Sequence, residues 1–321
     1  MKFKVFVTRE IPKMGIALLR KNGCSVDIFN ADRRPLKEEL LRHIRGKHAI
    51  LCLLTDKIDR DVITAGLPAL KVISNLAAGT DNIDLEFAAQ NGITVTNTPD
   101  ALTDATAELA GALIFACARR IIESDDFTRR GLFKGWEPML FRGADIHHQT
   151  LGIIGAGKIG QSVAEKSAGF NMKILYTAHA RKKDFEARTG ARKTTLQKLL
   201  KESDFVSIHA PLTQETRHML TRKELSIMKP AAYLINTGRG PIIKEDDLVW
   251  ALKNRKIAGA GLDVYEFEPA IHKDLIDLPN VVLLPHIGSA TVKTRETMSL
   301  TAADNIIAVL HGYMPKYIVN A

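Results

Sequence analysis

The sequence has few of the features that mark secreted, metal-binding or membrane proteins. Its three cysteines, Cys24, Cys52 and Cys117, are scattered and odd in number, and no pair has metal-ligand spacing. They are typical of reduced core residues in a cytosolic protein. The longest apolar run, residues 109–118, is too short to span a bilayer. The first residues, MKFKVFVT, lack an apolar signal core, so we expect no signal peptide, no membrane partner and a cytoplasmic location.

The chain has 321 residues, which favours two domains over one. Its 45 basic and 36 acidic residues give a net charge of +9. Such a charge is compatible with nucleic-acid binding or with a basic surface that binds small anions. The basic residues are spread along the chain and no nucleic-acid motif is present, so we favour the second interpretation. The densest cluster is Arg181–Lys183.

Short apolar segments alternate with helical patterns in both halves of the chain, which predicts doubly wound parallel sheets. In the first half the predicted strands are 4–8, 25–29, 49–54, 70–77 and 93–98. In the second half they are 151–154, 173–177, 205–210, 231–237, 258–265 and 280–286. A Thr and a Glu three residues apart in TRKEL (221–225) indicate a helix start with a capping box.

Two segments connect these halves. Residues 100–131 carry apolar positions three and four apart and no proline, which predicts one long helix linking two domains. Residues 132–149 lack periodicity and are predicted to be irregular. A final helical pattern, 291–312, ends at a glycine and could return to the first domain.

A glycine-rich loop follows the predicted strand LGII at 151–154. Gly155, Gly157 and Gly160 have G-x-G-x-x-G spacing and precede a helical pattern. In that context the first glycine permits a tight turn, the second lets the backbone approach a pyrophosphate, and the third lets helix and strand pack closely. The helix N-terminus then offers N–H groups to phosphates. The segment therefore predicts a dinucleotide site that also includes Ala156, Lys158 and Ile159.

The next strand, ILYT, ends without the acid that an NAD site places there for the ribose hydroxyls. The residues that follow are Ala178, His179, Ala180, Arg181 and Lys182. An Arg or Lys can bind a 2′-phosphate that a carboxylate would repel. We therefore predict NADP (NADPH) in preference to NAD. The alternative is that the basic residues form an ordinary solvated loop.

Ligands of open α/β sheets bind at the carboxyl ends of strands. The polar residues predicted there are His209, Arg239, Asp263, Glu268 and His286. Taken singly, each has a structural explanation, such as a solvent-facing arginine or a structural histidine. From their spacing alone, these five residues are as compatible with an active site as with separate structural roles.

Seven stretches in order carry a resemblance over nearly the whole chain. They are NLAAGTDNIDL, TNTPDALTDATAELA, GIIGAGKIGQ, HAPLTQETRHML, LINTGRGPII, AGLDVYEFEP and LPHIGSAT. The chain resembles the D-isomer specific 2-hydroxyacid dehydrogenase family and, within it, the glyoxylate/hydroxypyruvate reductase branch. The resemblance implies an α/β fold with a flavodoxin-like substrate domain (1–99 plus 291–321) and a Rossmann dinucleotide-binding domain (100–290), joined by long interdomain helices.

The resemblance also implies the roles of the polar residues. Arg239 would hold the substrate carboxylate and polarise the carbonyl, and His286 would donate the proton. Glu268 would orient His286, and Asp263 would contact the nicotinamide end. His209 is the rival proton donor, although we expect it to act on cofactor binding. The NTGRG turn departs from the commoner family form, which has alanine or serine before RG, and this leaves the shape of the substrate loop open.

Further contacts are implied for residues spread along the chain. The implied substrate contacts are Leu54, Ala78, Gly79 and Ser289, besides Arg239 and His286. The implied cofactor contacts, besides the glycine loop and the basic segment, are Thr106, His209, Pro211, Thr216, Thr237, Gly238, Asp263 and Gly288. No metal ligand is expected.

The resulting prediction is an NADPH-preferring reductase of small 2-oxo acids that forms a homodimer, with 132–149 as a possible contact. D-3-Phosphoglycerate and 2-ketogluconate dehydrogenases of the same family are alternatives. A phosphate-bearing substrate would need more cations than Lys57 near Leu54. An alternative of another class is a nucleotide-sensing protein that resembles a corepressor.

Overall fold

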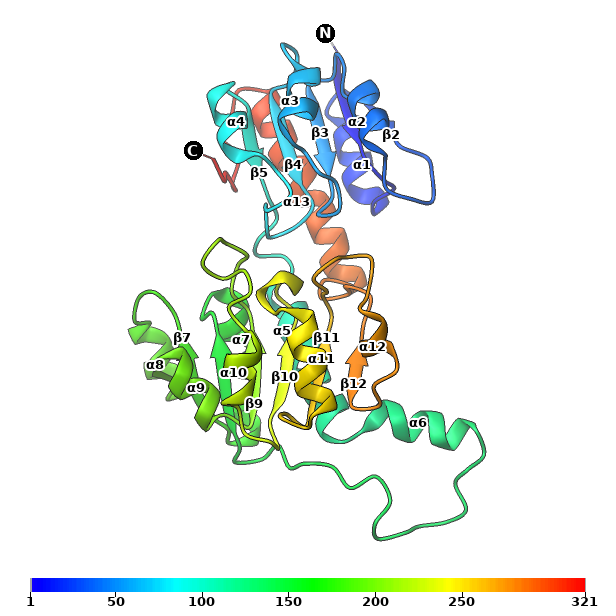
Figure 1. Ribbon diagram of the computed structural model, residues 1–321. Helices are drawn as coiled ribbons and strands as arrows, with labels where there is room; N and C mark the ends of the chain where they lie inside the picture. The colour runs from blue at the N-terminus through cyan, green and yellow to red at the C-terminus, as the bar shows by residue number, and fades with distance from the viewer. Residues whose placement is uncertain (1, 321) are drawn as a thin grey trace. The chain divides into compact units, whose positions relative to one another are not determined.

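The computed structural model describes residues 2–320, which divide into two compact units. Unit 1 combines the chain up to Leu102 with the segment from Ser289 onward, and unit 2 is Thr103–Gly288. Each unit contains one sheet in which all paired strands are parallel, with helices on both faces (Figure 1). The predicted α/β class with two doubly wound sheets is therefore confirmed.

Unit 1 has the strand order β2-β1-β3-β4-β5, which is the flavodoxin-like order. Its central strands β3 and β4 are buried on both faces, as parallel strands covered by helices must be, and β4 ends with the buried polar residues Ser74 and Asn75. Its strands are β1 (Phe3–Val7), β2 (Cys24–Ile28), β3 (Ala49–Cys52), β4 (Val72–Asn75) and β5 (Thr94–Thr96). Its helices are α1 (Lys13–Lys21), α2 (Lys37–His43), α3 (Arg60–Gly66), α4 (Leu85–Gln90) and α13 (Val292–Leu310).

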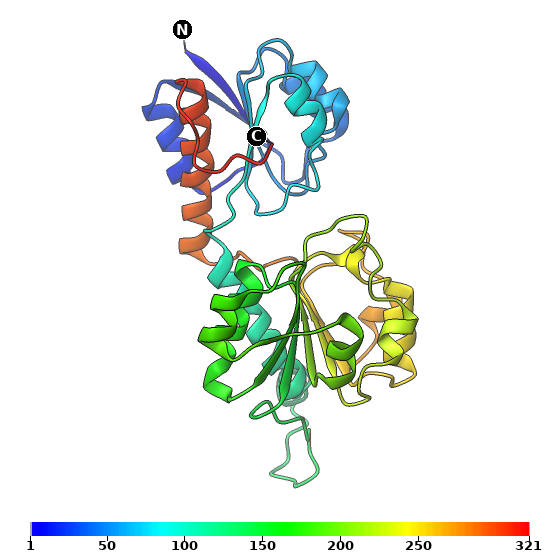
Figure 2. The same ribbon diagram turned by 90° about the vertical axis from the view of Figure 1, so that its left-hand side faces the viewer.

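The last helix, α13, belongs to the first sheet. It lies beside α1 on one face, while α2, α3 and α4 cover the other face (Figure 2). The two backbones approach so closely that a Cβ built on Gly15 would lie 2.4 Å from the carbonyl oxygen of Ser299. The predicted return of the C-terminal helix to the first domain is confirmed.

Unit 2 has the strand order β12-β11-β10-β9-β6-β7-β8. Counted within the unit, this is the Rossmann order with one additional strand, and the order reverses between β6 and β9. Its strands are β6 (Thr150–Ile154), β7 (Lys173–Thr177), β8 (Arg192–Lys193), β9 (Phe205–Ile208), β10 (Tyr233–Asn236), β11 (Gly259–Leu262) and β12 (Val281–Leu283). Its helices are α5 (Thr103–Ala118), α6 (Ile121–Arg129), α7 (Lys158–Ser167), α8 (Lys183–Thr189), α9 (Leu196–Glu202), α10 (Arg222–Ser226), α11 (Glu245–Lys253) and α12 (Lys273–Ile276), with 3-10 turns at Ala168–Phe170 and Gly240–Ile242.

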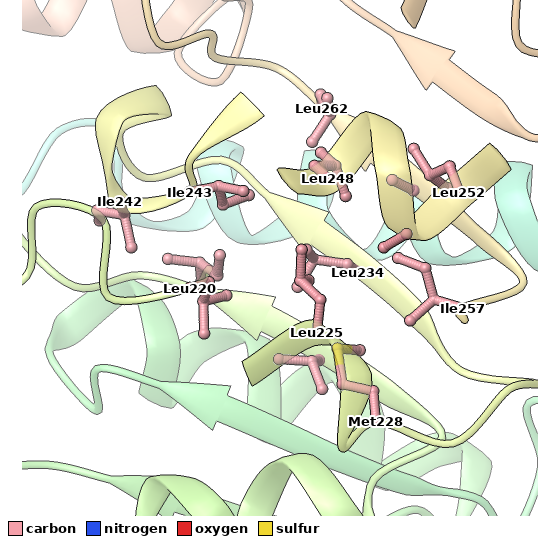
Figure 3. Close-up of a cluster of buried hydrophobic side chains, with 14 of the residues drawn as sticks. Leu220, Leu225, Met228, Leu234, Ile242, Ile243, Leu248, Leu252, Ile257 and Leu262 are labelled. Carbon is pink, nitrogen blue, oxygen red and sulfur yellow. The ribbon is translucent and has the colours of Figure 1, made fainter. Parts of the chain in front are cut away.

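Apolar clusters on both faces of this sheet hold the helices in place. One cluster joins the sheet to α9, α10 and α11 (Figure 3), and the other joins it to α5, α7 and α8. The predicted capping box opens α10, because Glu224 accepts the backbone N–H of Thr221 at 3.1 Å. Within residues 2–320, no helix is both long and apolar enough to cross a membrane.

The predicted single helix over residues 100–131 is wrong. Arg120 adopts a left-handed conformation with φ of +52° between α5 and α6. The carbonyl oxygen of Ala118 accepts the N–H of Ala144 at 2.8 Å, so the returning chain ends α5. Neither proline nor glycine marks this break, which is why periodicity missed it. The predicted irregular segment 132–149 is confirmed and extends from unit 2 as a long loop (Figure 1).

Candidate active site

The three loop glycines meet three different steric demands. Gly155 has φ of +95°, and a Cβ there would lie 2.6 Å from the backbone nitrogen of Ala210. A Cβ on Gly160 would lie 2.3 Å from the carbonyl oxygen of Gly155. A Cβ on Gly157 would meet nothing within 4 Å, and this residue is exposed. The first glycine therefore lets the loop approach the chain that follows β9, the third lets α7 pack on the loop, and the second leaves the backbone open to a ligand.

The helix that follows offers a place for phosphates. Gly157 is the N-cap of α7 and has no capping side chain, and the first turn of α7 contains no acidic residue. Ala156 is buried and Ile159 is half-buried, so the loop rests on the core while its outer edge faces solvent. The positive end of the helix dipole at this position suits the pyrophosphate of a dinucleotide. The residues present therefore fit the pyrophosphate of a dinucleotide.

The basic loop after β7 contains an acid that the sequence pattern did not reveal. Glu186 accepts hydrogen bonds from Arg181 Nε at 2.7 Å and from the Tyr176 hydroxyl at 2.8 Å. Burial raises the pKa of Glu186, but these two hydrogen bonds outweigh it and the net pKa is lowered. Glu186 is therefore ionised at neutral pH, and the charge of Arg181 is already paired. The backbone N–H of Lys182 also binds the Tyr176 hydroxyl at 2.8 Å and fixes the loop.

Two further cations stand beside this loop. Lys193 Nζ donates to the carbonyl oxygen of His179 at 2.9 Å, and Arg192 precedes it on β8. A cavity of about 700 Å³ lies here. Its lining residues are Arg181, Glu186, Ala191, Arg192, Lys193, Thr194 and Thr195. Three cations against one carboxylate leave it positive, and strand pairing of β8 with β7 brings Arg192 and Lys193 to a place that sequence spacing did not indicate.

His209 follows β9 and lies next to the glycine loop at the point where the strand order reverses. Its Nε2 lies 2.8 Å from Ser207 Oγ, and its Nδ1 lies 3.5 Å from Thr237 Oγ1. Enclosure of its ring by protein atoms lowers the pKa of His209 to about 3. The lowered pKa favours the neutral form of His209 at neutral pH, which suits a hydrogen-bonding role better than that of an imidazolium donor.

The loop beyond His209 is closed by its own hydrogen bonds. Thr216 Oγ1 donates to the carbonyl oxygen of Pro211 at 2.7 Å and accepts the N–H of Thr213 at 2.7 Å. These bonds set Pro211 and Thr216 in one compact turn at the carboxyl edge of the sheet. The predicted cofactor contacts in this segment therefore share one rigid element.

His286 and Glu268 form a pair. His286 Nδ1 lies 2.9 Å from Glu268 Oε2, and Glu268 Oε1 accepts the N–H of Tyr265 at 3.0 Å. Burial raises the pKa of Glu268, but the bonds from His286 and Tyr265 and the nearby charge of Arg239 lower it by more. The ionised carboxylate orients the His286 ring through Nδ1, and within residues 2–320 no protein atom hydrogen-bonds to Nε2.

Asp263 holds the backbone on which His286 stands. Its two carboxylate oxygens accept the N–H groups of Ile287 at 2.7 Å and Gly288 at 2.8 Å. On the other side, Thr106 Oγ1 donates to the carbonyl oxygen of Gly288 at 3.2 Å. Burial raises the pKa of Asp263. The predicted nicotinamide contact of Asp263 remains a prediction; what its geometry displays is the clamping of a loop in which His286 has φ of +56°.

Arg239 stands on a turn that a buried asparagine clamps. Asn236 Oδ1 accepts the N–H of Gly238, and its Nδ2 donates to the carbonyl oxygen of Arg239, both at 3.0 Å. A Cβ on Gly240 would lie 1.8 Å from the carbonyl oxygen of Tyr265, so the turn presses on the segment that leads to Glu268. Arg239, Glu268 and His286 thus belong to one part of unit 2. Asn236 is a positioning residue that the sequence did not single out.

The predicted substrate residues Leu54, Ala78 and Gly79 lie in unit 1, in the loops after β3 and β4. Asn82 joins these loops, because its Nδ2 donates to the carbonyl oxygens of Leu53 at 3.1 Å and Asp56 at 3.0 Å. Ala78 and Gly79 are half-buried. Ser289 begins the returning segment of unit 1 and accepts the N–H of Thr291 at 2.9 Å.

A Rossmann unit that combines a glycine loop with a carboxylate-supported imidazole and an arginine defines a dinucleotide-dependent oxidoreductase. Residues 111–288 match the family model described as D-isomer specific 2-hydroxyacid dehydrogenase, NAD binding domain. The glyoxylate reductase of Thermococcus litoralis is 48% identical over 324 residues, which cover 100% of this chain and 97% of that protein. The chain belongs to the D-isomer specific 2-hydroxyacid dehydrogenase family and is an oxidoreductase of that family.

Solved structures agree with this assignment. A protein of Thermus thermophilus has a TM-score of 0.93 and 42% identity, covering 99% of this chain and 100% of that one. The NADPH-dependent glyoxylate/hydroxypyruvate reductase of Sinorhizobium meliloti, solved with NADP and malonate, has a TM-score of 0.88 and 29% identity, covering 99% and 97%. The predicted family and its glyoxylate reductase branch are confirmed.

Proposed function

We propose that this enzyme reduces small 2-oxo acids of the glyoxylate and hydroxypyruvate type to the D-2-hydroxy acid, with NADPH preferred over NADH. The observation that carries the proposal is the pairing of His286 with Glu268 beside Arg239. Relatives named glyoxylate reductase that align over the whole chain support the substrate class.

The residues suit the chemistry of carbonyl reduction. A nicotinamide cofactor, when bound, supplies a hydride to the carbonyl carbon. Arg239 would bind the substrate carboxylate and stabilise negative charge that develops on the carbonyl oxygen. His286 would protonate that oxygen from Nε2, while Glu268 holds the ring by Nδ1 and stabilises its charged form. The proton then balances the hydride, and the product is the hydroxy acid.

The cofactor preference rests on the residues at the end of β7. No carboxylate occupies 177–180, Arg192 and Lys193 line the cavity beside the loop, and Lys182 adds a further positive charge in the loop itself. These groups favour a 2′-phosphate. Glu186 opposes them by pairing with Arg181, so we propose a preference for NADPH rather than exclusion of NADH.

We further propose a homodimer in a cytoplasmic setting. The irregular segment 132–149 exposes the large apolar side chains of Phe133, Trp136 and Met139, and Trp136 is 84% exposed. Sedimentation equilibrium of the wild type and of Trp136→Ser should show a dimer that the variant weakens, whereas a monomeric wild type would contradict this proposal. All three cysteines are free and buried, as in proteins of reducing compartments.

The substrate class is tested by following NADPH absorbance with glyoxylate, hydroxypyruvate, 2-ketogluconate and 3-phosphohydroxypyruvate. We expect the highest kcat/KM with the first two, and a higher kcat/KM with NADPH than with NADH. His286→Ala should lower kcat by a factor of about 10² or more while NADPH binding survives. Absence of oxidation with every acid, or equal use of NADH, would overturn the corresponding part of the proposal.

A further inference from the structure

Four consecutive backbone carbonyl groups in the loop after β4, residues 77–80, all accept hydrogen bonds inside unit 1. Their donors are, in chain order, Thr98 N at 2.8 Å, Asn97 Nδ2 at 2.7 Å, Asn75 Nδ2 at 2.8 Å and Ile83 N at 3.0 Å. Two of the four donors are thus side-chain amides of asparagine. The loop is half-buried apart from Ala77, which is buried.

Because the peptide bond is planar, the direction of each carbonyl also fixes the direction of the N–H group of the next residue. In a trans peptide the N–H of the next residue points opposite to the carbonyl. The carbonyls of residues 77–79 point toward the side chains of Asn97 and Asn75 and the backbone of Thr98. The N–H groups of residues 78–80 therefore point away from these three donors. Within residues 2–320, none of these three N–H groups donates to a protein acceptor. Successive backbone amides without protein acceptors are a known arrangement for binding anions.

The two asparagines are themselves held in place. Asn75 is the fully buried last residue of β4, and its Nδ2 also donates to Asn82 Oδ1 at 3.0 Å. The carbonyl oxygen of Asn97 accepts Asn305 Nδ2 at 3.2 Å, and Asn305 is buried on α13. These side chains are neutral, so they orient the loop without adding charge to it.

We propose that Asn97 and Asn75 are positioning residues that pre-organise the N–H groups of Gly79 and Thr80, beside the N–H of Ala78 that the Thr98 backbone orients, to receive the carboxylate of the substrate. This inference rests on the proposed reduction of 2-oxo acids and adds residues that do not touch the substrate themselves. It assigns Thr80 a role equal to those of Ala78 and Gly79. A purely structural role for the asparagines is the competing explanation, and the two differ in what a variant changes.

The test compares Asn97→Ala with Asn91→Ala. Asn91 is a matched control, since its Nδ2 also donates to a backbone carbonyl, that of Phe87 at 2.8 Å, but at an exposed helix end. Asn97→Ala should raise KM for glyoxylate about tenfold, equivalent to about 1.4 kcal/mol. We expect kcat to stay within about threefold and KM for NADPH to stay unchanged, whereas Asn91→Ala should behave as the wild type.

A carbonyl substrate without a carboxylate sharpens the comparison. With methylglyoxal, which has no carboxylate, the Asn97→Ala penalty in kcat/KM should fall below about twofold. An equal penalty with both substrates, or a loss confined to kcat, would overturn the inference. If Asn97→Ala does not fold, Asn97→Leu removes the same donor and keeps the volume.

Binding of oxalate to the NADPH-loaded protein separates this inference from the proposed function. If the wild type reduces no 2-oxo acid, the proposed function fails. Oxalate affinity that drops at least fivefold in the Asn97 variant would still support the amide site. Equal oxalate affinity in both proteins would refute it.

Discussion

His209 allows the electrostatics of unit 2 to be tested without any substrate. The residue is half-buried, and desolvation lowers the pKa of its ring from 6.5 to about 3. In the unfolded chain the ring binds a proton as the pH falls below 6.5, whereas in the folded protein it stays neutral. The unfolded state therefore binds more protons below pH 6.5, and acidification removes stability.

The magnitude follows from the two pKa values. At pH 5 the unfolded ring is 1.5 pH units below its pKa of 6.5, while the folded ring is still above its own. The free energy of unfolding should fall by RT ln(1 + 10^1.5), about 2 kcal/mol, relative to pH 7.5. This corresponds to about 30-fold in the unfolding equilibrium constant. The result is insensitive to the folded pKa as long as that value lies below about 4.

The assay can be confined to unit 2, because Trp136 and Trp250, the two tryptophans of the chain, both lie in it. Urea unfolding of the cofactor-free protein, followed by tryptophan fluorescence at pH 7.5 and pH 5, should be compared for the wild type and His209→Gln. Other groups titrate equally in both proteins, so the difference between the two pH dependences isolates His209. We expect the wild type to lose about 2 kcal/mol more than the variant.

Two results would refute this reasoning. The first is the same pH dependence in the wild type and in His209→Gln. The second is movement of the His209 ring C–H resonance in NMR spectra between pH 8 and pH 5, which would show that the folded ring takes up a proton. Either result would restore His209 as a candidate proton donor beside His286.

Three further predictions concern the cofactor and the catalytic pair. Glu268→Gln removes the anion beside His286, so the alkaline fall in kcat should begin at lower pH; an unshifted pH–rate profile would contradict the pairing. Glu186→Gln removes the carboxylate that pairs with the Arg181 guanidinium, so the ratio of kcat/KM for NADPH to that for NADH should rise about threefold or more. An unchanged ratio would show that Glu186 has no influence on cofactor preference. Gly160→Ala forces a Cβ to 2.3 Å from a backbone oxygen and should lower the free energy of unfolding of unit 2 by about 2 kcal/mol or more. The control Gly157→Ala should leave the urea midpoint unchanged and weaken NADPH binding.

Much of the architecture could be predicted from the sequence because parallel strands leave a simple signature. The segment at 205–210 became β9, all four of whose residues are buried, and the segment at 173–177 became β7, in which the buried Ile174 and Tyr176 alternate with less buried residues. The break at Arg120 could not be predicted in this way. It depends on a hydrogen bond from Ala144, and such a contact leaves no periodic trace.

The candidate site also contains residues that local sequence motifs predict and residues that they do not. Gly155, Gly160 and the pair of Glu268 with His286 follow motifs whose spacing is local, so the sequence sufficed to find them. Glu186 was missed because it lies five residues beyond Arg181, one turn into α8, where an acid is ordinarily a solvated helix residue. The positioning asparagines were missed because asparagine near a strand end usually indicates only a turn.

These asparagines reveal a chemical regularity in how the loops are held. Asn75 ends β4 and Asn236 ends β10, and each donates its amide to a carbonyl of the loop that follows. Asp263, just beyond β11, instead accepts two N–H groups of the His286 loop. A carbonyl requires a donor and an N–H requires an acceptor, so an ionised Asp can hold only N–H groups, whereas an Asn can hold both, as Asn236 does when it also accepts the N–H of Gly238. Where a carbonyl is held, the opposite N–H is directed away from its holder, which suits an anion. Where N–H groups are held, as beyond β11, the backbone offers no such donors, and the loop presents a side chain instead.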